Sequence, residues 1–455
     1  MRQVLFVCND TVGHRMAGPA IRCIELAKTL AGDFDVVVAA RNLDESYVPP
    51  IKLIAADSDT VAAAAAQADV VVVQGDALRR NPALLEIKGA LVADMYCPIP
   101  LEYHMSSTGV PESVRLEHGW HVSRLMQEQL FYADYFLCAS ERQMDFWSGA
   151  LTMAGRINAI SMPDGIRTGL EHFVACVPFG LSDETPVANA HPLREKFNIP
   201  QDEFLMVWGG GIYEWFDPVT IIKAIAKLER EGLRSHLVFL GVKHPNPGIA
   251  DHDKLTVAVQ TSRDLGVLDR LVHFNFGWVE YSRRHEYLMD ADVGVSAHLD
   301  NAETRFSFRT RMLDYLWCGL PIVATRGDEF GEIVGREGLG IATDYENSDD
   351  WVSAIRRMVT DDAFRAQCRN AVAETRERYR WSEVVRPMRQ VFKELAASPD
   401  RAYARRRAAE VGFQGSAAAP IPPPSIMSRV RAVYAQRGLV GLVRAIVNRV
   451  RREVA

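Results

Sequence analysis

The sequence predicts an α/β protein made of two Rossmann-like domains, each a doubly wound parallel sheet, that face one another across a cleft. Three observations predict this fold class. Short β-branched and apolar runs alternate with longer amphipathic stretches along most of the chain, which indicates repeated βαβ units. The runs lack the period-2 alternation of half-exposed strands, so they are expected to be buried on both faces. A proline-containing polar stretch at residues 180–192 divides the runs into two series.

The predicted strands fall on both sides of that stretch. Those of the first series are 4–7, 35–40, 69–74, 90–96, 135–140 and 173–180. Those of the second series are 204–211, 236–241, 272–277, 293–298 and 321–325. The amphipathic stretches at 20–31 and 217–232 are predicted helices between strands. Open parallel sheets bind ligands beyond the carboxyl ends of their strands, so a ligand site is expected in the cleft between the domains.

These patterns divide the chain into four segments. The two Rossmann-like domains are predicted at residues 1–182 and 193–398, and the last helix of the second is expected to return to the first. Residues 399–427 are basic, rich in small residues and then rich in proline, which predicts a linker. Residues 428–455 are predicted to form a basic amphipathic helix.

Composition excludes several classes of function. The 455 residues carry a formal net charge of -6, whereas nucleic-acid-binding domains are usually basic. Seven cysteines without a Cys-x-x-Cys pair favour reduced thiols over a disulfide framework or a zinc site. No run approaches the roughly 20 apolar residues of a membrane-spanning helix, and the first residues do not resemble a signal peptide. A cytoplasmic protein is expected, with peripheral attachment to the inner face of the plasma membrane as an option.

That option rests on the C-terminal segment. Placed at roughly 100° steps, its apolar residues from 439 onward fall within an arc of about 160°. They are Leu439, Val440, Leu442, Val443, Ile446, Val447, Val450 and Val454. Arg437, Arg444, Arg449, Arg451 and Arg452 lie outside the arc. This pattern is typical of a helix in an anionic membrane interface. A helix that docks on its own catalytic domain or on a second subunit has the same pattern, and amphipathicity does not separate the two.

The stretch "FRTRMLDYLWCGLPIVAT" follows a predicted strand and the polar loop at 299–307. A helix beginning near Arg309 would present free N–H groups and a positive dipole end, which suit a phosphate. Arg309 and Arg311 could add bidentate contacts to phosphate oxygens. Asp314, one turn further on, could accept hydrogen bonds from sugar hydroxyls. An amphipathic helix with Arg–Asp pairs at its surface explains the same spacing equally well.

The run "ADVGVSAH…FRTRMLDYLWCGLPIVAT…GEIV" resembles the donor-binding signature of retaining family 4 glycosyltransferases, which have the two-domain GT-B fold. In that family two carboxylates separated by seven residues precede a Cys-Gly-x-Pro-Val segment. Asp314 matches the second carboxylate, and the resemblance implies that it binds the ribose of the nucleotide. Phe306 stands where the first carboxylate is expected. Glu303 is the nearest substitute for that carboxylate in the loop, and Ser307 is a further donor-binding candidate.

Other parts of the chain extend the resemblance over roughly residues 1–390. The segment "HFNFGWVEYSRRHEYLMDADVGVS" implies that Trp278 and Val279 line the base pocket, although both could be core residues. "GPAIRCIELAKTLA" resembles the N-terminal glycine loop, in which Gly18 would let the backbone approach a ligand.

The second domain begins with "WGGGIYEWFDP", where the family usually has an Arg and a Lys for the donor diphosphate. This chain has neither of them at that place. Gly210 and Gly211 are predicted to contact the donor there, and Arg309, Arg311 and Lys243 are the candidates to replace the missing charges.

The N-terminal domain offers one catalytic candidate. The family's histidine after the fourth strand is absent, and Asp94 stands at the end of that predicted strand instead. A carboxylate there could accept a proton from an acceptor hydroxyl, or it could cap the next segment. The Asp-rich stretches at 57–59 and 251–253 are predicted turns rather than metal sites. Neither a metal nor a cofactor is expected.

The resulting prediction is a retaining, metal-independent glycosyltransferase, with Asp94, Arg309 and Arg311 as catalytic residues. It would move a sugar from a nucleoside diphosphate to a glycan or lipid-linked hydroxyl, in cell-surface polysaccharide or glycolipid assembly. Two alternatives stay open. The departures from the family signature are compatible with a non-catalytic GT-B scaffold protein, and a sugar-nucleotide epimerase could share the fold.

Overall fold

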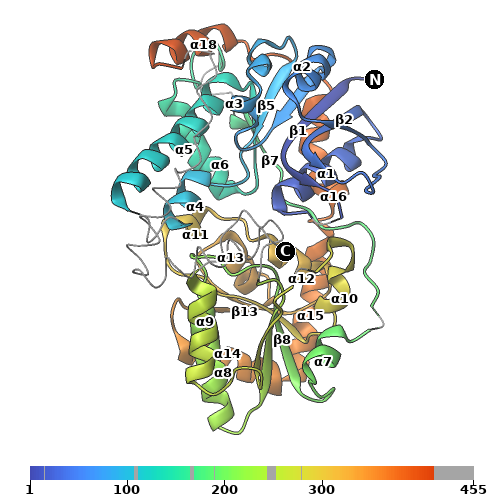
Figure 1. Cartoon of the computed structure of the whole chain (residues 1–455), viewed down its shortest axis with the longest axis vertical. Coiled ribbons are helices and arrows are strands. Elements are labelled where there is room, and N and C mark those ends of the chain that lie inside the picture. Colours follow the sequence, from blue (N-terminus) through green and yellow to red (C-terminus); the bar gives the residue numbers. More distant parts are fainter. Residues whose placement is uncertain are drawn as a thin grey trace, which may run out of the picture.

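The computed structural model describes residues 1–14, 16–106, 111–163, 169–188, 190–242, 253–277 and 279–413. It has two parallel-sheet α/β domains, which confirms the predicted fold class. In Figure 1 the N-terminal domain occupies the upper part and the C-terminal domain the lower part, with α4 (Ile99–Ser106) and α11 (Ala302–Phe306) meeting between them.

The N-terminal sheet contains seven parallel strands within the described ranges, in the order β3-β2-β1-β4-β5-β6-β7. Its strands are β1 (Gln3–Val12), β2 (Asp35–Leu43), β3 (Lys52–Ala55), β4 (Val70–Val73), β5 (Ala90–Asp94), β6 (Tyr135–Cys138) and β7 (Val174–Cys176). The central strands are buried on both faces, as the absence of alternation predicts. The order reverses between β1 and β4, which places the switch point of this sheet at the end of β1.

The C-terminal sheet has six parallel strands in the described part of the chain, in the order β10-β9-β8-β11-β12-β13. Its strands are β8 (Phe204–Trp208), β9 (Ser235–Phe239), β10 (Val272–Phe274), β11 (Val293–Ser296), β12 (Ile322–Thr325) and β13 (Gly340–Thr343). The switch point lies between β8 and β11. The sequence did not predict β3 and β13, which are short edge strands with little full burial and therefore a weak apolar signal.

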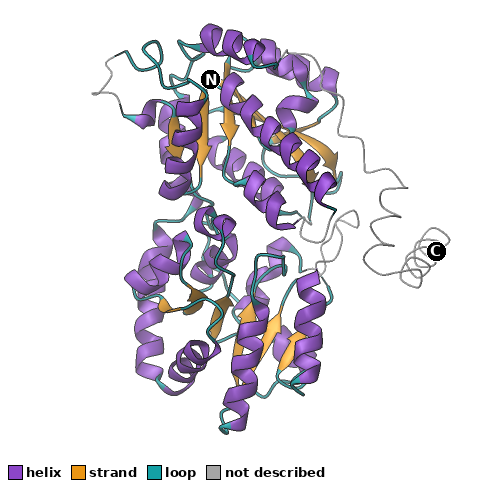
Figure 2. Ribbon diagram, turned by 90° about the vertical axis from the view of Figure 1, so that its left-hand side faces the viewer, coloured by secondary structure: helices purple, strands orange, loops and turns teal. Residues whose placement is uncertain are grey.

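Helices cover both faces of each sheet, as the side view in Figure 2 shows. Those of the N-terminal domain are α1 (Gly18–Leu30), α2 (Ser58–Gln67), α3 (Ala77–Arg80), α4, α5 (Glu112–Tyr132) and α6 (Glu141–Met153). Those of the C-terminal domain are α7 (Pro192–Phe197), α8 (Pro218–Arg230), α9 (Asp253–Asp264), α10 (Arg284–Leu288), α11, α12 (Thr310–Trp317), α13 (Glu329–Arg336), α14 (Ser348–Thr360) and α15 (Asp362–Glu377). Short 3₁₀ helices span Pro82–Glu86, Leu170–His172 and Tyr281–Arg283. None of the described helices is long and apolar enough to cross a membrane.

The chain crosses between the domains at two places that lie side by side. Leu181 pairs with Arg380 in an isolated parallel bridge. The Leu181 N–H donates to the Tyr379 carbonyl at 2.8 Å, and the Trp381 N–H donates to the Leu181 carbonyl at 2.9 Å. Gly180 packs so closely on Trp381 that a Cβ there would lie 2.4 Å from the indole. The two crossings therefore form one hydrogen-bonded unit.

After the second crossing the chain runs along the N-terminal domain. Helix α16 (Trp381–Val384) contacts α1, α17 (Arg386–Phe392) contacts β7, and α18 (Arg401–Glu410) contacts α5. Helix α18 lies at the top of the upper domain in Figure 1. This helix corrects the prediction of a linker from residue 399 onward, because the Ala- and Arg-rich stretch "RAYARRRAAE" has high intrinsic helix propensity. The end of the predicted linker and the predicted helix at 428–455 lie outside the described residues.

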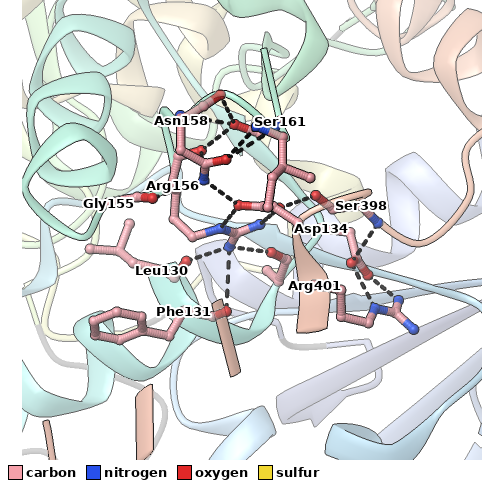
Figure 3. Close-up of polar contacts among 12 residues, drawn as sticks. Leu130, Phe131, Asp134, Gly155, Arg156, Asn158, Ser161, Ser398 and Arg401 are labelled. Carbon is pink, nitrogen blue, oxygen red and sulfur yellow. Dashed lines mark hydrogen bonds and ion pairs between the residues drawn. The ribbon is translucent and has the colours of Figure 1, made fainter. Parts of the chain in front are cut away.

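Buried charges fix this returning segment to the N-terminal domain. The Arg156 guanidinium donates two hydrogen bonds of 3.0 Å to the Asp400 carboxylate, and both side chains are almost fully buried. Arg156 also donates to the Leu130 carbonyl at 2.6 Å and to the Ala133 carbonyl at 2.7 Å. Figure 3 shows this cluster beside the ion pair of Arg401 with Asp134. Removing one partner of a buried ion pair strongly destabilises the folded protein, because the other charge stays buried without its counter-charge.

Candidate functional site

Three adjoining pockets line the cleft between the two switch points. The Val279 pocket includes Leu240, Val279 and Leu288. The Arg311 pocket shares Asp314 and Arg284 with the Val279 pocket, and shares Gly18 and Arg311 with the Glu102 pocket. The Glu102 pocket includes Asp10, Glu102 and Glu303 and has a cavity volume of about 440 Å³. That volume lies within the roughly 300–1,000 Å³ that small-molecule sites occupy.

Arg311 is a buried cation at the junction of the pockets. Its Nη2 donates to the Gly211 carbonyl at 2.9 Å, while its Nη1 has no hydrogen-bond partner among the described residues. The guanidinium lies 4.1 Å from the centre of the Phe216 ring and 4.6 Å from that of Trp208. Burial lowers the pKa of Arg311 to about 10, so it stays charged at neutral pH. An unpaired buried charge is costly to the folded protein, which indicates that an anion completes the site.

Two helix N-termini, one from each domain, adjoin this cation. Helix α1 begins at Gly18, has Ala17 as its N-cap without a capping side chain, and has no acidic residue in its first turn. Helix α12 begins at Thr310, also without a side-chain cap or an acidic first turn. Ala17, Gly18 and Thr310 line the Arg311 pocket. Both dipoles therefore favour negative charge at the same place, since a helix N-terminus carries about half a positive charge.

Gly18 has open space beside it, because a Cβ built there would meet nothing within 4 Å. The backbone at Gly18 is thus accessible from the cleft. Gly210 has a φ of +77°, which favours glycine, and it lines the Arg311 pocket together with Gly211. These three glycines lie where the sequence predicts donor contacts. Two other predicted donor-binding residues, Lys243 and Trp278, lie outside the described residues.

Arg309 is already neutralised by carboxylates of its own domain. It donates to both carboxylate oxygens of Glu303, at 2.9 and 2.7 Å, and its Nε lies 3.3 Å from an oxygen of Asp328. Ser307 donates to the same Glu303 carboxylate. Burial would lower the pKa of Arg309, but the charge of Glu303 raises it. The three predicted residues Glu303, Ser307 and Arg309 thus form one buried cluster at the wall of the Glu102 pocket, in which Arg309 is not a free cation.

Asp314, the predicted ribose ligand, lines the Arg311 and Val279 pockets. Its carboxylate accepts a hydrogen bond of 2.7 Å from the Nε of Arg284, and its side chain stays about one-third exposed. Arg284 is held between the rings of Tyr281 and Trp317, at 3.8 and 4.3 Å from their centres. The other carboxylate oxygen accepts no hydrogen bond from the described residues, so it could accept one from a hydroxyl group. Val279 lines the adjoining apolar pocket that would take a base.

Asp94 does not line any of the three pockets. Its side chain is fully buried, accepts two hydrogen bonds from Arg22 at 2.7 and 2.9 Å, and accepts a third from Gln74 at 2.8 Å. Arg22 in turn donates to the Val177 carbonyl. Together these contacts connect α1 and β5 with the residues that directly follow β4 and β7. The catalytic role predicted for Asp94 is therefore corrected to a structural one.

Glu102, on α4, is a carboxyl group of the N-terminal domain that does line the cleft, and the sequence analysis leaves it out of the candidate residues. Burial and then the charge of Glu303 raise the pKa of Glu102 to about 7. A carboxyl with such a pKa can exchange a proton near neutral pH. The sequence signal that could have found it is its place in the first turn of a helix directly after β5, at a carboxyl edge of the sheet.

The raised pKa of Glu102 predicts a pH dependence of stability. Protonation of this carboxyl is favoured in the folded state, so its contribution is lost as pH rises from about 4.5 towards 7. We expect Glu102→Gln to reduce the loss of unfolding free energy between about pH 5 and about pH 8. Urea unfolding at these two pH values measures the change in unfolding free energy. The exposed Glu112→Gln variant is the control, and an equal pH dependence in all three proteins contradicts the assignment.

Phe306, which stands at the place of the first signature carboxylate, does not line any of the three pockets. Its ring packs on Phe146 of the N-terminal domain with 4.8 Å between centroids. Its carbonyl accepts a hydrogen bond of 2.9 Å from Gln143, which also donates to Tyr96. Phe306 thus joins the two domains. Within the described ranges no group of His, Cys, Asp or Glu side chains is arranged to hold a metal ion.

Comparison with known proteins agrees with this fold. Residues 205–361 match the family model described as Glycosyl transferases group 1. The Anabaena HepE structure in complex with UDP and glucose aligns with a TM-score of 0.63 and 16% identity, covering 87% of this chain and 100% of that chain. Sucrose-phosphate synthase from Thermosynechococcus elongatus aligns with a TM-score of 0.58 and 14% identity, covering 86% of this chain and 98% of that chain. The fold is GT-B.

Among proteins related to this GT-B chain by sequence are D-inositol 3-phosphate glycosyltransferases. That of Xylanimonas cellulosilytica is 25% identical over 234 residues, which is 51% of this chain and 50% of the relative. That of Saccharomonospora viridis is 23% identical over 207 residues, 45% of this chain and 46% of the relative. The matched part thus spans about half the length of these relatives.

Proposed function

We propose that the chain is a glycosyltransferase that moves a sugar from a nucleoside diphosphate to a hydroxyl acceptor. The observation that carries this proposal is the buried, unpaired guanidinium of Arg311 between two uncapped helix N-termini. That arrangement suits the diphosphate of a nucleotide sugar. Asp314 would then accept the ribose hydroxyls, and the Val279 pocket would take the base. The match to group 1 glycosyl transferases over residues 205–361 supports the same assignment.

The reaction follows from this placement. The bond between the anomeric carbon and the diphosphate oxygen breaks, and a bond from the acceptor oxygen to that carbon forms. The acceptor proton passes to a base or to a departing phosphate oxygen. Arg311 and the two helix N-termini would stabilise the charge on the leaving diphosphate without a metal ion. We propose that the acceptor attacks the same face of the sugar from which the diphosphate departs, so that the configuration at the anomeric carbon is retained. UDP is the donor nucleotide we favour, because solved neighbours are complexes with UDP.

Titration with nucleotides tests the proposal. Arg311→Met is expected to weaken binding of UDP, GDP or dTDP by about 1.5–3 kcal/mol, roughly 10- to 150-fold, because a charged hydrogen bond is lost. Its unfolding free energy is expected to stay equal or to rise, since an unpaired buried charge is removed. Isothermal titration and urea unfolding measure the two effects. The exposed Arg356→Met variant, whose side chain pairs with Glu231, is the control. Unchanged nucleotide affinity in Arg311→Met contradicts the donor site.

A non-catalytic scaffold remains the second candidate, and one observation favours it. Phe306 occupies the position of a signature carboxylate and serves the contact between the domains instead. The same titration separates the candidates, because a scaffold without a donor site gives no heat with any of the three nucleotides.

We also propose that the acceptor belongs to cell-surface polysaccharide or glycolipid assembly and that residues 428–455 attach the enzyme to an anionic membrane. Arginine near such a surface contributes about 1 kcal/mol per charge. We expect the full chain to sediment with anionic liposomes at low salt, and a truncation after Gly415 to stay in the supernatant. Neutral liposomes are the control for electrostatic attraction. Equal recovery of both forms in the supernatant contradicts this attachment.

A further inference from the structure

The Glu102 pocket adjoins the proposed donor site on the side away from the base. It shares Gly18, Thr310 and Arg311 with the Arg311 pocket and extends towards Asp10 and Glu102 of the N-terminal domain. A sugar carried by the diphosphate would end at this junction, so the remaining volume is open to the acceptor. The inference below rests on the proposed function and concerns the acceptor alone.

Carboxyl groups enter the Glu102 pocket from three elements. Asp10 lies in β1, Glu102 in α4 and Glu303 in α11. The Asp10 carboxylate accepts a hydrogen bond of 2.7 Å from the Thr11 N–H, its one hydrogen bond among the described residues. Carboxylates accept hydrogen bonds from sugar hydroxyls readily, whereas another anion beside them is repelled.

Arg309 and Arg311, the cations that line the pocket in the described part of the chain, are not free to pair with an anionic acceptor. Arg309 is held by both oxygens of Glu303 and lies 3.3 Å from Asp328. Arg311, at the other end, faces the proposed diphosphate. No other Lys or Arg lines the pocket in the described part of the chain. Burial, and then the charge of Glu303, raise the pKa of Glu102, and these same surroundings disfavour a further anion in the pocket.

Aromatic side chains form the rest of the wall. Tyr213 and Trp215 stack with 5.1 Å between ring centroids and 19° between planes, and both line the pocket. Phe216 and Tyr96 extend the apolar surface. Aromatic faces pack on the C–H face of a sugar or cyclitol ring, while the hydroxyls at its edge reach polar groups. The wall and the carboxyl groups therefore suit a polyhydroxylated ring.

We propose that the acceptor is a neutral polyhydroxylated ring and that the Glu102 pocket discriminates against the same ring bearing a phosphate. Asp10, and Glu102 when it is ionised, accept hydrogen bonds from its hydroxyls and repel the phosphorylated form. Specificity of this kind comes as much from the repelled competitor as from contacts with the accepted ligand.

Matched ligand pairs test this proposal on the UDP-saturated full chain. The probes are glucose with glucose 6-phosphate, and myo-inositol with myo-inositol 3-phosphate, measured by isothermal titration. At least one neutral ring is expected to bind, with its phosphate at least about tenfold weaker, the effect of roughly 1.4 kcal/mol of repulsion. Glu102→Gln combined with Asp10→Asn is expected to reduce that ratio, and Trp215→Ala to weaken the neutral ring while leaving UDP affinity unchanged.

The outcomes separate this inference from the proposed function. If UDP binds but a phosphate binds as tightly as its neutral partner, or no neutral ring binds, the inference is overturned and the donor site stands. An unchanged ratio in the double variant, checked for folding by its urea transition, also overturns it. If the wild-type chain binds no nucleoside diphosphate, the proposed function fails instead.

Discussion

Asp94→Ala is expected to lower the unfolding free energy by about 3–5 kcal/mol, because it leaves the Arg22 guanidinium buried without its counter-charge. The pair is fully buried, with contacts of 2.7 and 2.9 Å, and Gln74 also loses its acceptor. Urea unfolding measures the loss. A catalytic carboxylate would give the opposite pattern, in which activity disappears while stability is kept.

Two further variants make the result specific. Replacing both partners, Arg22→Met with Asp94→Ala, is expected to recover much of the loss, because no isolated charge remains. Asp349→Ala removes an exposed partner of Lys227 and is expected to cost less than about 1 kcal/mol. If Asp94→Ala were as mild as Asp349→Ala, the buried pair would not support the N-terminal domain.

Asp400→Ala is expected to have an effect of similar size, about 3–5 kcal/mol, because Arg156 then lies buried among carbonyl groups without a carboxylate. Asn158 loses an acceptor as well. The loss should be concentrated in the returning segment, so amide hydrogen exchange in α18 is expected to accelerate more than exchange in β4 or β5.

Glu410→Ala is the control for this second prediction, since it removes an exposed pair with Arg407 in the same helix. Its effect is expected to stay below about 1 kcal/mol. Uniform acceleration of exchange over the whole N-terminal domain would contradict a local role for the Asp400 cluster.

Much of the fold could be predicted because it follows from residue patterns along the chain. Buried parallel strands leave apolar runs, and the polar stretch at 180–192 separates the two sheets. The position of Arg311 and Asp314 in the cleft was predictable for the same reason, since a helix that follows a strand places its first turn at the carboxyl edge of the sheet. The Ala- and Arg-rich stretch of α18 was misjudged from its basic composition, although its helix propensity is high.

Side-chain partners could not be predicted, because they depend on contacts between distant residues. Asp94 and Glu102 both follow the same predicted strand, but Arg22 holds one of them in the core. An arginine on the buried face of the 20–31 stretch was the available signal, because it requires a carboxylate partner. Arg309 is the N-cap residue of α12 and Arg311 lies in its first turn, so their side chains point differently and Glu303 neutralises only Arg309.

The paired crossings at Leu181 and Arg380 also determine how the cleft can open. Two segments that are hydrogen-bonded to each other cannot slide or twist independently without breaking those bonds. Rotation about a single axis near them is the movement that keeps both bonds. Under such a rotation the N-termini of α1 and α12 would move apart and together along one arc. The halves of the anion site would therefore reassemble in one geometry each time the domains close.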